Sequence, residues 1–256
     1  MIRRPALALL PLVIVATLAG CASPIATPED SEPVTVTVLA AASLTDSFAE
    51  LEQQFEADNP GVDVVLSVGG SSALAEQIVA GSPADVFAAA NGTTMATVVD
   101  AGLTEGDPRD FATNTLQIVT PSDNPGAVGS LADFATAELL IALCESAVPC
   151  GSASDTVFAT AGITPAPDTL EQDVKAVLTK VELGEVDAGL VYRTDVIAAG
   201  EVVLGIDFLE ADSAINHYPI AALSAAADAG AGADFVAFVL SPTGQTILQE
   251  AGFGAP

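Results

Sequence analysis

The sequence predicts an α/β protein of two lobes, each built on a mostly parallel sheet flanked by helices. Short apolar runs rich in Val alternate with segments of helical periodicity, which is the order expected of parallel strands joined by crossover helices. This alternation occurs in two series, before and after Asn114, so two sheets are expected. The segment that begins near Pro219 is too short for a domain and must pack on one of the two lobes.

The first series predicts three strands, each followed by a helix. The expected strands are residues 34–40, 62–68 and 85–89. The expected helices are residues 43–58, 72–80 and 95–101. A glycine follows the end of each helix, as is common at helix C-termini. The repeated order predicts parallel strands with right-handed crossovers.

The second series and the tail complete the two lobes. Strands are expected at residues 115–120, 139–143, around Thr169, and at 188–192. Helical segments are expected at residues 130–134, after Gly151, and at 173–183. The tail adds a strand at residues 219–223 and two helical segments, including residues 233–240. One lobe then comprises residues 34–113 plus 218–256 and the other residues 114–217, with crossings near Asn114 and His217.

The N-terminus reads as an export signal. Arg3 and Arg4 precede an apolar run at residues 7–18, and Leu18-Ala19-Gly20-Cys21 has the form of a lipobox. Residues 1–20 are therefore expected to be a lipoprotein signal peptide, with Cys21 lipidated and residues 21–33 forming a tether. A plain signal peptide or a single membrane anchor is the alternative, but a membrane span needs about 20 apolar residues.

The remaining cysteines also fit an oxidising compartment. Removing Cys21 from the three cysteines leaves Cys144 and Cys150, in the stretch CESAVPCG. The simplest expectation is a disulfide around a small loop. A metal or redox pair is the lesser alternative, because the spacing is not CxxC and no histidine lies nearby.

The charge is strongly acidic. Lys plus Arg number 6 and Asp plus Glu 34, giving −28, and loss of Arg3 and Arg4 with the signal would make this −30. Nucleic acid is an improbable partner, since phosphate binding needs a basic surface. We interpret the acidic excess as a solvated surface facing the outside of the cell. No long apolar segment follows the signal.

Four joints between a strand and a helix have a residue able to cap the helix. Helix N-termini present unpaired N–H groups and a positive dipole end, which together favour anions. Capping alone would explain any single joint. Several joints lie at the carboxyl ends of parallel strands, however, where α/β folds bind ligands. The joints are at Ser43, with Asp46 completing a capping box; at Ser71 and Ser72; at Cys150-Gly151-Ser152; and at Asp173-Val174.

These segments resemble one family along essentially the whole mature chain. LAAASLTDSF, GGSSALAEQI, GSPADVFAAAN, VPCG, EQDVKAVLTKVELGEVDAGLVYRTD and HYPIA occur in the order typical of the periplasmic molybdate-binding proteins of ABC transporters. The resemblance implies a type II periplasmic-binding fold that closes around molybdate or tungstate. It also implies binding through neutral hydroxyl and N–H donors, with no cofactor and no catalytic residue.

The resemblance places five ligand-binding residues in this sequence. The hydroxyls would come from Ser43, Ser71 and Tyr192, and the backbone N–H groups from Cys150 and Val174. Molybdenum would be bound as its oxyanion through these residues, without direct side-chain coordination. Gly70 and Cys150 depart from the family pattern, which often has serine and alanine there. A bond from Cys150 to Cys144 would fix the turn. Without the resemblance, Tyr192 reads as a half-buried aromatic at a strand end.

Four further residues near these segments are expected to play other roles. Asp85 should hold a turn, because a carboxylate aimed at a dianion would repel it. The single histidine, His217, is expected at a hinge or on the surface. Arg193 should be solvated, and Lys175 could attract an anion without contacting it.

The sequence thus predicts a monomeric, lipid-anchored receptor that passes molybdate or tungstate to the permease of an ABC transporter. A receptor for sulfate or another oxyanion is the main alternative, and a sensor that reports to a membrane partner is a further one. A serine hydrolase is the rival from another class, with Ser71 as nucleophile and His217 as base. The strict G-x-S-x-G is absent, which counts against it.

Overall fold

The computed structural model describes residues 33–256. The expected signal peptide, Cys21 and nearly all of the expected tether lie outside the described residues. Within residues 33–256, no helix combines the length and the apolar character that a membrane span requires.

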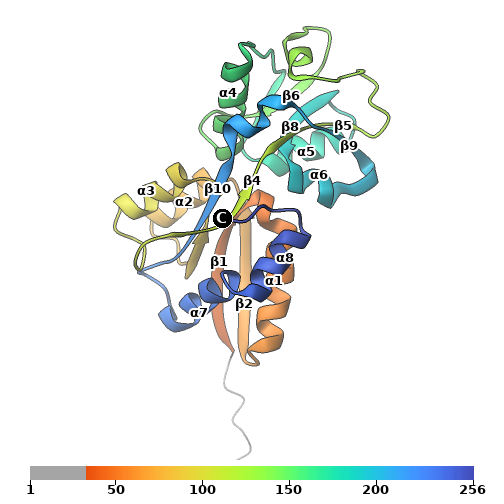
Figure 1. The fold of residues 1–256 in the computed structure, drawn as a ribbon. Helices are drawn as coiled ribbons and strands as arrows, with labels where there is room; N and C mark the ends of the chain where they lie inside the picture. The colour runs from red at the N-terminus through yellow and green to blue at the C-terminus, as the bar shows by residue number, and fades with distance from the viewer. Residues whose placement is uncertain (1–32) are drawn as a thin grey trace, which may run out of the picture. The chain divides into compact units, whose positions relative to one another are not determined.

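Two five-stranded sheets organise the fold, which confirms the predicted α/β class (Figure 1). The strand order is β2-β1-β3-β10-β4 in the first sheet and β7-β6-β8-β5-β9 in the second. The first sheet contains β1 (Val34–Ala41), β2 (Val62–Gly69), β3 (Val86–Ala88), β4 (Arg109–Asn114) and β10 (Asn216–Ala222). The second contains β5 (Leu116–Pro121), β6 (Ile141–Cys144), β7 (Thr169–Glu171), β8 (Ala188–Tyr192) and β9 (Val203–Ile206).

Strand pairing is more mixed than the sequence predicted. β1 is parallel to β2 and β3, and β6 is parallel to β7 and β8. By contrast, β10 is antiparallel to β3 and β4, and β5 is antiparallel to β8 and β9. The reason is topological, because β5 and β10 are the strands that the chain enters directly from the other sheet, without a crossover helix of the same sheet.

Eight α-helices within the described residues flank the two sheets. They are α1 (Thr45–Asp58), α2 (Ser71–Val79), α3 (Gly92–Asp100), α4 (Pro149–Ala161), α5 (Val174–Glu182), α6 (Arg193–Ala199), α7 (Ala229–Val239) and α8 (Pro242–Glu250). Four short 3-10 turns join them, namely η1 (Ala42–Leu44), η2 (Leu131–Ala135), η3 (Gly200–Val202) and η4 (Leu209–Ala214). The sequence did not predict β4, β9 or α6, and the helix expected after Gly151 begins three residues earlier, at Pro149.

The chain passes between the sheets at two places. It leaves the first sheet between β4 and β5, at Thr115, and returns between η4 and β10, at Ile215. The strands β4 and β10 pair beside each other, with Asn114 opposite Asn216 (Figure 1). The crossings expected near Asn114 and His217 are therefore where the strands change sheet, while the exact lobe limits stay a prediction.

Each sheet has its own apolar core. In the first, Phe48, Phe55, Phe111 and Phe235 are buried and pack in tilted and edge-to-face pairs. In the second, Phe134 packs on Phe158. Six of the buried polar side chains lie near strand ends and the crossings: Ser43, Ser71, Asn114, Thr194, Asp195 and Asn216. A buried polar group needs a hydrogen-bond partner, so this region is the place to look for a site.

Candidate ligand-binding site

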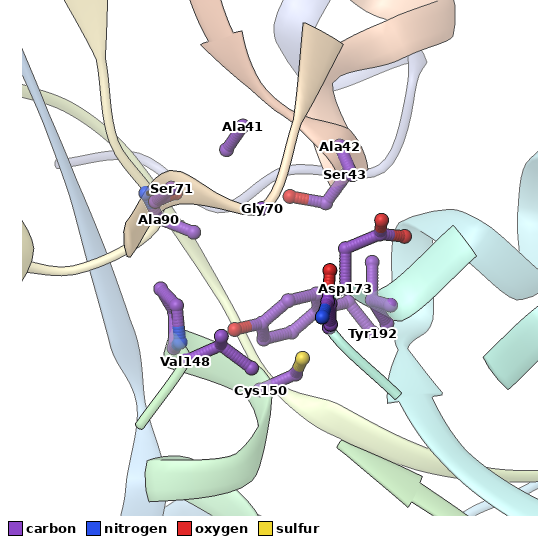
Figure 2. A pocket seen from close by; sticks show the side chains of 13 residues that line it. Ala41, Ala42, Ser43, Gly70, Ser71, Ala90, Val148, Cys150, Asp173 and Tyr192 are labelled. Carbon is purple, nitrogen blue, oxygen red and sulfur yellow. Dashed lines mark hydrogen bonds between the residues drawn. The ribbon is translucent and has the colours of Figure 1, made fainter. Parts of the chain in front are cut away.

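A small cavity of about 20 Å³ lies where the carboxyl ends of strands from both sheets meet. A cavity of roughly 10–15 Å³ already holds one water molecule, so this one suits a single small solute. All five ligand residues expected from the resemblance line it, and Figure 2 shows Ser43 and Ser71 on one side with Tyr192 and Cys150 across from them. The lining residues are Ala41, Ala42, Ser43, Gly70, Ser71, Ala90, Val148, Pro149, Cys150, Gln172, Asp173, Val174 and Tyr192.

Strand order explains why these residues meet. Ser43 follows β1 and Ser71 follows β2, and these strands are parallel neighbours, so both strand ends open on the same edge. Cys150 follows β6 at the start of α4, Val174 follows β7 as the first residue of α5, and Tyr192 ends β8. The strand β6 is the parallel neighbour of both β7 and β8. Ligand sites at such an edge are typical of α/β folds.

Ser43 does not cap a helix, which corrects the sequence prediction. It lies inside η1, and α1 begins after Leu44 with no side-chain cap, so Asp46 forms no capping box with it. The Ser43 hydroxyl is instead 3.0 Å from the hydroxyl of Tyr218. The 3-10 turn moves the serine into the chain reversal before the helix, where its hydroxyl faces the buried strand β10 instead of the helix N–H groups.

Ser71 is the first residue of α2, and the N-cap is Gly70. The Ser71 hydroxyl accepts a hydrogen bond from the N–H of Ala90 at 3.1 Å. Because that interaction uses an acceptor lone pair, the Ser71 hydrogen remains available for donation. Next to it, Ser72 donates to the carbonyl of Ala147 at 2.8 Å, which joins α2 to the turn before α4.

The N–H groups of Cys150 and Val174 are the free donors at the starts of α4 and α5. Neither has a hydrogen-bond partner among residues 33–256, as expected for the first turn of a helix. Asp173 caps α5 by accepting from the N–H of Ala176 at 2.9 Å, which confirms that prediction. The Cys144–Cys150 disulfide is also confirmed. It ties the end of β6 to α4, beside a turn so tight that a Cβ on Gly151 would collide with the carbonyl of Glu145.

Tyr192 is fully buried, with its side chain at the cavity. Its hydroxyl is 2.9 Å from the amide nitrogen of Asn216, which donates to it. Burial raises the pKa of Tyr192 well above its usual range, and the neighbouring Tyr218 and the carboxylate of Asp195 add to this effect. Burial likewise raises the pKa of Tyr218. Both phenols therefore stay protonated and able to donate.

No positive charge lines the cavity within the described part of the chain, and Asp173 is the single carboxylate there. Lys175 lies nearby, where its ammonium is 2.8 Å from Asp46 and 3.6 Å from Asp195. Burial raises the pKa of Asp195 to about 6, although Lys175 and the N–H of Tyr192 oppose the shift. As expected, Lys175 is close to the cavity without lining it.

Three other residues take the structural roles predicted for them. Asp85 is buried and accepts hydrogen bonds from the N–H groups of Thr37 and Ala227, both at 2.7 Å. His217 is exposed on β10, 3.6 Å from Asp110, and does not line the cavity. Arg193 is exposed, although β8 ends before it and α6 begins there, so no strand alternation sets its direction.

Sequence reasoning missed two residues that support the site, Asn216 and Tyr218. Both are buried on β10, and their polar atoms touch Tyr192 and Ser43 respectively. The available signal was the stretch INHYPIA, in which Asn216 and Tyr218 are two positions apart and so share one face of the strand, with His217 on the other.

The donor set defines what the cavity can do chemically. Three hydroxyls and two free N–H groups surround a space without a cation, which suits an anion that needs only acceptor oxygens. Among residues 33–256, no group of three His, Cys, Asp or Glu side chains could hold a metal ion. The arrangement therefore suits a solute with acceptor oxygens, and the described residues offer no cluster for coordinating a bare metal.

Comparison with known proteins agrees with this geometry. Residues 36–254 match the family described as bacterial extracellular solute-binding protein. The molybdate-binding protein ModA of Mycobacterium tuberculosis is 39% identical over 248 residues, which cover 95% of each chain.

Two solved structures share the fold at low identity. The periplasmic molybdate-binding protein of Azotobacter vinelandii is 22% identical, with a TM-score of 0.75 over 86% of this chain and 99% of its own. The sulfate-binding protein SubI of Mycobacterium tuberculosis is 17% identical, with a TM-score of 0.75 over 86% of each chain. The two scores are equal, so structural likeness supports the fold and does not choose between these oxyanions.

Proposed function

The chain belongs to the bacterial extracellular solute-binding protein family, and on that premise we propose that it captures molybdate or tungstate in the cavity between its two sheets. The family binds solutes for transport and is not catalytic. Its extracytoplasmic setting agrees with the disulfide between Cys144 and Cys150. The 39% identity to ModA of Mycobacterium tuberculosis supports molybdate as the solute.

The observation that carries the proposal is the convergence of five neutral donors on one small cavity. The hydroxyls of Ser43 and Ser71 lie on one side of it, and Tyr192 and Cys150 lie across from them (Figure 2). Val174, whose N–H is the fifth donor, also lines it. Each hydrogen bond to a charged oxyanion contributes about 1.5–3 kcal/mol, so five such bonds can offset dehydration of a dianion.

Donors without acceptors also favour a fully deprotonated oxyanion. Asp173 is the cavity's single carboxylate, and its Oδ1 is occupied by the N–H of Ala176. An anion that keeps a proton, such as hydrogen phosphate, would need an acceptor for that proton. Sulfate carries no proton and must be excluded by size instead, so it remains the alternative ligand. Its support is a fold likeness to SubI at 17% identity.

Capture ends with the two parts of the chain in contact around the solute. The Ser72 hydroxyl bonds to Ala147, and Lys175 pairs with Asp46, in each case joining a helix on the first sheet to a segment on the second. The β4–β10 pair provides the hinge. The closed form then delivers the oxyanion to an ABC permease. The chain acts as a monomer, held at the outer face of the cell membrane by lipid on Cys21.

Calorimetric titration of the full-length protein with molybdate, tungstate, sulfate and phosphate tests the proposal. We expect one-to-one binding of molybdate and tungstate, with sulfate far weaker and phosphate undetected. Ser43→Ala should weaken molybdate binding about 10-fold or more, from the loss of one charged hydrogen bond. Ser47→Ala is the matched control, because Ser47 is also buried but bonds to the carbonyl of Leu44, away from the cavity. Absence of binding by every oxyanion would refute the proposal.

A serine hydrolase receives no support from the geometry. Ser71 lines the cavity while His217 lies outside it, 3.6 Å from Asp110. A nucleophilic serine would donate to a base, and among the described residues no histidine lines the cavity beside Ser71.

A further inference from the structure

Asn216 occupies the crossing between the two sheets. It is the first residue of β10, it is 6% exposed, and it lies opposite Asn114 in the β4–β10 pair. Its side chain does not line the cavity, yet its hydrogen bonds reach both sides of it. Its amide nitrogen is 2.8 Å from the carbonyl of Ala90 and 2.9 Å from the hydroxyl of Tyr192.

The direction of both bonds follows from chemistry. The Ala90 carbonyl can only accept, so the group of Asn216 that faces it must be the nitrogen, which fixes the orientation of the amide. An amide nitrogen has two hydrogens and no acceptor lone pair for this purpose. The second hydrogen is therefore donated to Tyr192, and the Tyr192 oxygen is an acceptor in that bond.

This acceptor role determines where the Tyr192 proton goes. The hydroxyl has a single hydrogen, which must point away from Asn216. Its possible acceptors are an oxyanion in the cavity and the phenol of Tyr218, which is close enough to affect the pKa of Tyr192. In the second case Tyr218 is driven to donate to Ser43, 3.0 Å away, and Ser43 in turn donates into the cavity. Either path delivers a donor to the bound anion.

The same amide supports Ser71 through the backbone of one residue, Ala90. Asn216 holds the carbonyl of Ala90, and the N–H of Ala90 donates to the Ser71 hydroxyl at 3.1 Å. Ser71 therefore also receives a hydrogen bond from behind and has its own hydrogen free. One buried amide thus contacts the Tyr192 hydroxyl directly and the Ser71 hydroxyl through Ala90, on opposite sides of the cavity.

We propose that Asn216 is a positioning residue that sets the polarity of the cavity: it forces the hydroxyl of Tyr192 to act as a donor and holds Ala90 in place, whose N–H leaves the Ser71 hydrogen free for donation. This inference rests on the proposed function, because an oxyanion is the ligand that needs such donors. It gives the cavity a basis for preferring fully deprotonated tetrahedral oxyanions that does not depend on a cation. It also explains why an amide is buried at the hinge, where a polar group costs free energy unless it is hydrogen-bonded.

Two substitutions of Asn216 distinguish its role as a hydrogen-bond donor from its role in packing. Asn216→Asp keeps the shape of the side chain but replaces the donating nitrogen with an acceptor. The Tyr192 hydroxyl would then donate its single hydrogen to the new carboxylate and could no longer donate it to the anion. Asn216→Leu removes both donors without adding charge. We expect each to raise the molybdate Kd of the full-length protein by at least about 10-fold. His217→Leu, at the next and exposed position of β10, should change it less than about 2-fold.

A double-mutant cycle of Asn216→Leu with Tyr192→Phe tests the mechanism, since it measures coupling to the hydroxyl itself. The double variant should bind no more than about 3-fold more weakly than the weaker single variant. Thermal unfolding without ligand checks that each variant is folded. Independent, multiplicative losses in the cycle, or wild-type affinity in Asn216→Asp, would overturn the inference while leaving the receptor proposal standing. Failure of the wild-type protein to bind any oxyanion would instead refute the receptor proposal and this inference with it.

Discussion

The ammonium of Lys175 lies 2.8 Å from the carboxylate of Asp46, and this ion pair joins α5 on the second sheet to α1 on the first. The same ammonium is 3.6 Å from the buried carboxylate of Asp195. Burial alone would lower the pKa of Lys175, but the carboxylates of Asp195 and Asp46 outweigh it and raise that pKa. Lys175 therefore stays charged and connects the two parts of the chain at the edge of the cavity.

Lys175→Met should weaken molybdate binding by a modest factor. The Asp46 side chain is 62% exposed, so solvent screens the pair, and about 2- to 5-fold in Kd is the expected loss. The loss should shrink as salt concentration rises, because exposed pairs are screened. Titration calorimetry at low and high salt measures both effects.

Lys180→Met is the matched control for that variant. Lys180 lies on the same helix with similar exposure, but it pairs with Glu171 and Glu185 on the second sheet's side of the molecule. Equal effects of the two substitutions would mean that Lys175 acts through overall charge and not through its bridge.

Gly70→Ala should oppose contact between the two sheets around the ligand. A Cβ on Gly70 would collide with the backbone carbonyl of Gln172, which lies across the cavity. Relieving such a collision typically costs about 1–3 kcal/mol, which corresponds to a roughly 5- to 150-fold weaker molybdate affinity. Because the collision arises only when the two sides meet, thermal stability without ligand should fall much less than the affinity.

Gly69→Ala provides the comparison, since a Cβ there meets only the side chain of Leu74 at 3.7 Å, an ordinary contact. Its affinity should stay within about 2-fold of wild type. If Gly70→Ala bound as tightly as Gly69→Ala, the contact between Gly70 and Gln172 would have no part in binding.

Local pattern was sufficient to predict the two sheets. The runs that became β1, β2, β6 and β8 are apolar and flanked by helical periodicity, so they could be assigned to strands directly. β4 was missed because RDFATN carries two charges and little apolar pattern. α6 was missed because RTDVIAA spans only two turns, too short for periodicity to emerge. The antiparallel strands β5 and β10 depend on which sheet the chain enters, which no local pattern encodes.

The ligand residues of the site could not be predicted from local pattern. Their places came from family resemblance, and the structure brings all five to one cavity, although their ligand roles stay a prediction. The supporting contacts could not be predicted, because Ser43 and Tyr218 are separated by 175 residues and Asn216 and Ala90 by 126. The capping role of Ser43 was wrong because local rules favour the helix, whereas the tertiary contact to Tyr218 decides its orientation.

Loss of the Cys144–Cys150 disulfide should reduce both stability and affinity. The two cysteines are six positions apart, and closing so small a loop contributes about 2 kcal/mol in the chain-entropy description. The bond also holds the turn that presents the N–H of Cys150 to the cavity. We expect Cys144→Ser/Cys150→Ser to unfold at a lower temperature and to bind molybdate several-fold more weakly.

A reducing agent supplies the control in this case. Treatment of the wild-type protein should reproduce the stability and affinity of the double variant, and treatment of the double variant should change neither. Wild-type affinity in the double variant would show that the turn holds its shape without the bond.

Protonation of Asp195 should make part of the stability depend on pH. Burial raises its pKa from 3.8 to about 6 in the folded chain, so between these values the folded state binds more protons than the unfolded state. The contribution of Asp195 to the free energy of unfolding must then fall as pH rises through this window, by up to about 3 kcal/mol. Denaturant unfolding of the wild-type protein and Asp195→Asn, compared from about pH 4 to pH 7, isolates this contribution because the other carboxylates cancel. The variant should gain stability relative to wild type as pH rises.

Asp133→Asn is the control, because hydrogen bonds from Gly129 and Ser130 lower the pKa of Asp133 and so give its stability contribution the opposite dependence on pH. A difference between wild type and Asp195→Asn that stays constant with pH would mean that Asp195 remains ionised, held by Lys175 despite its burial.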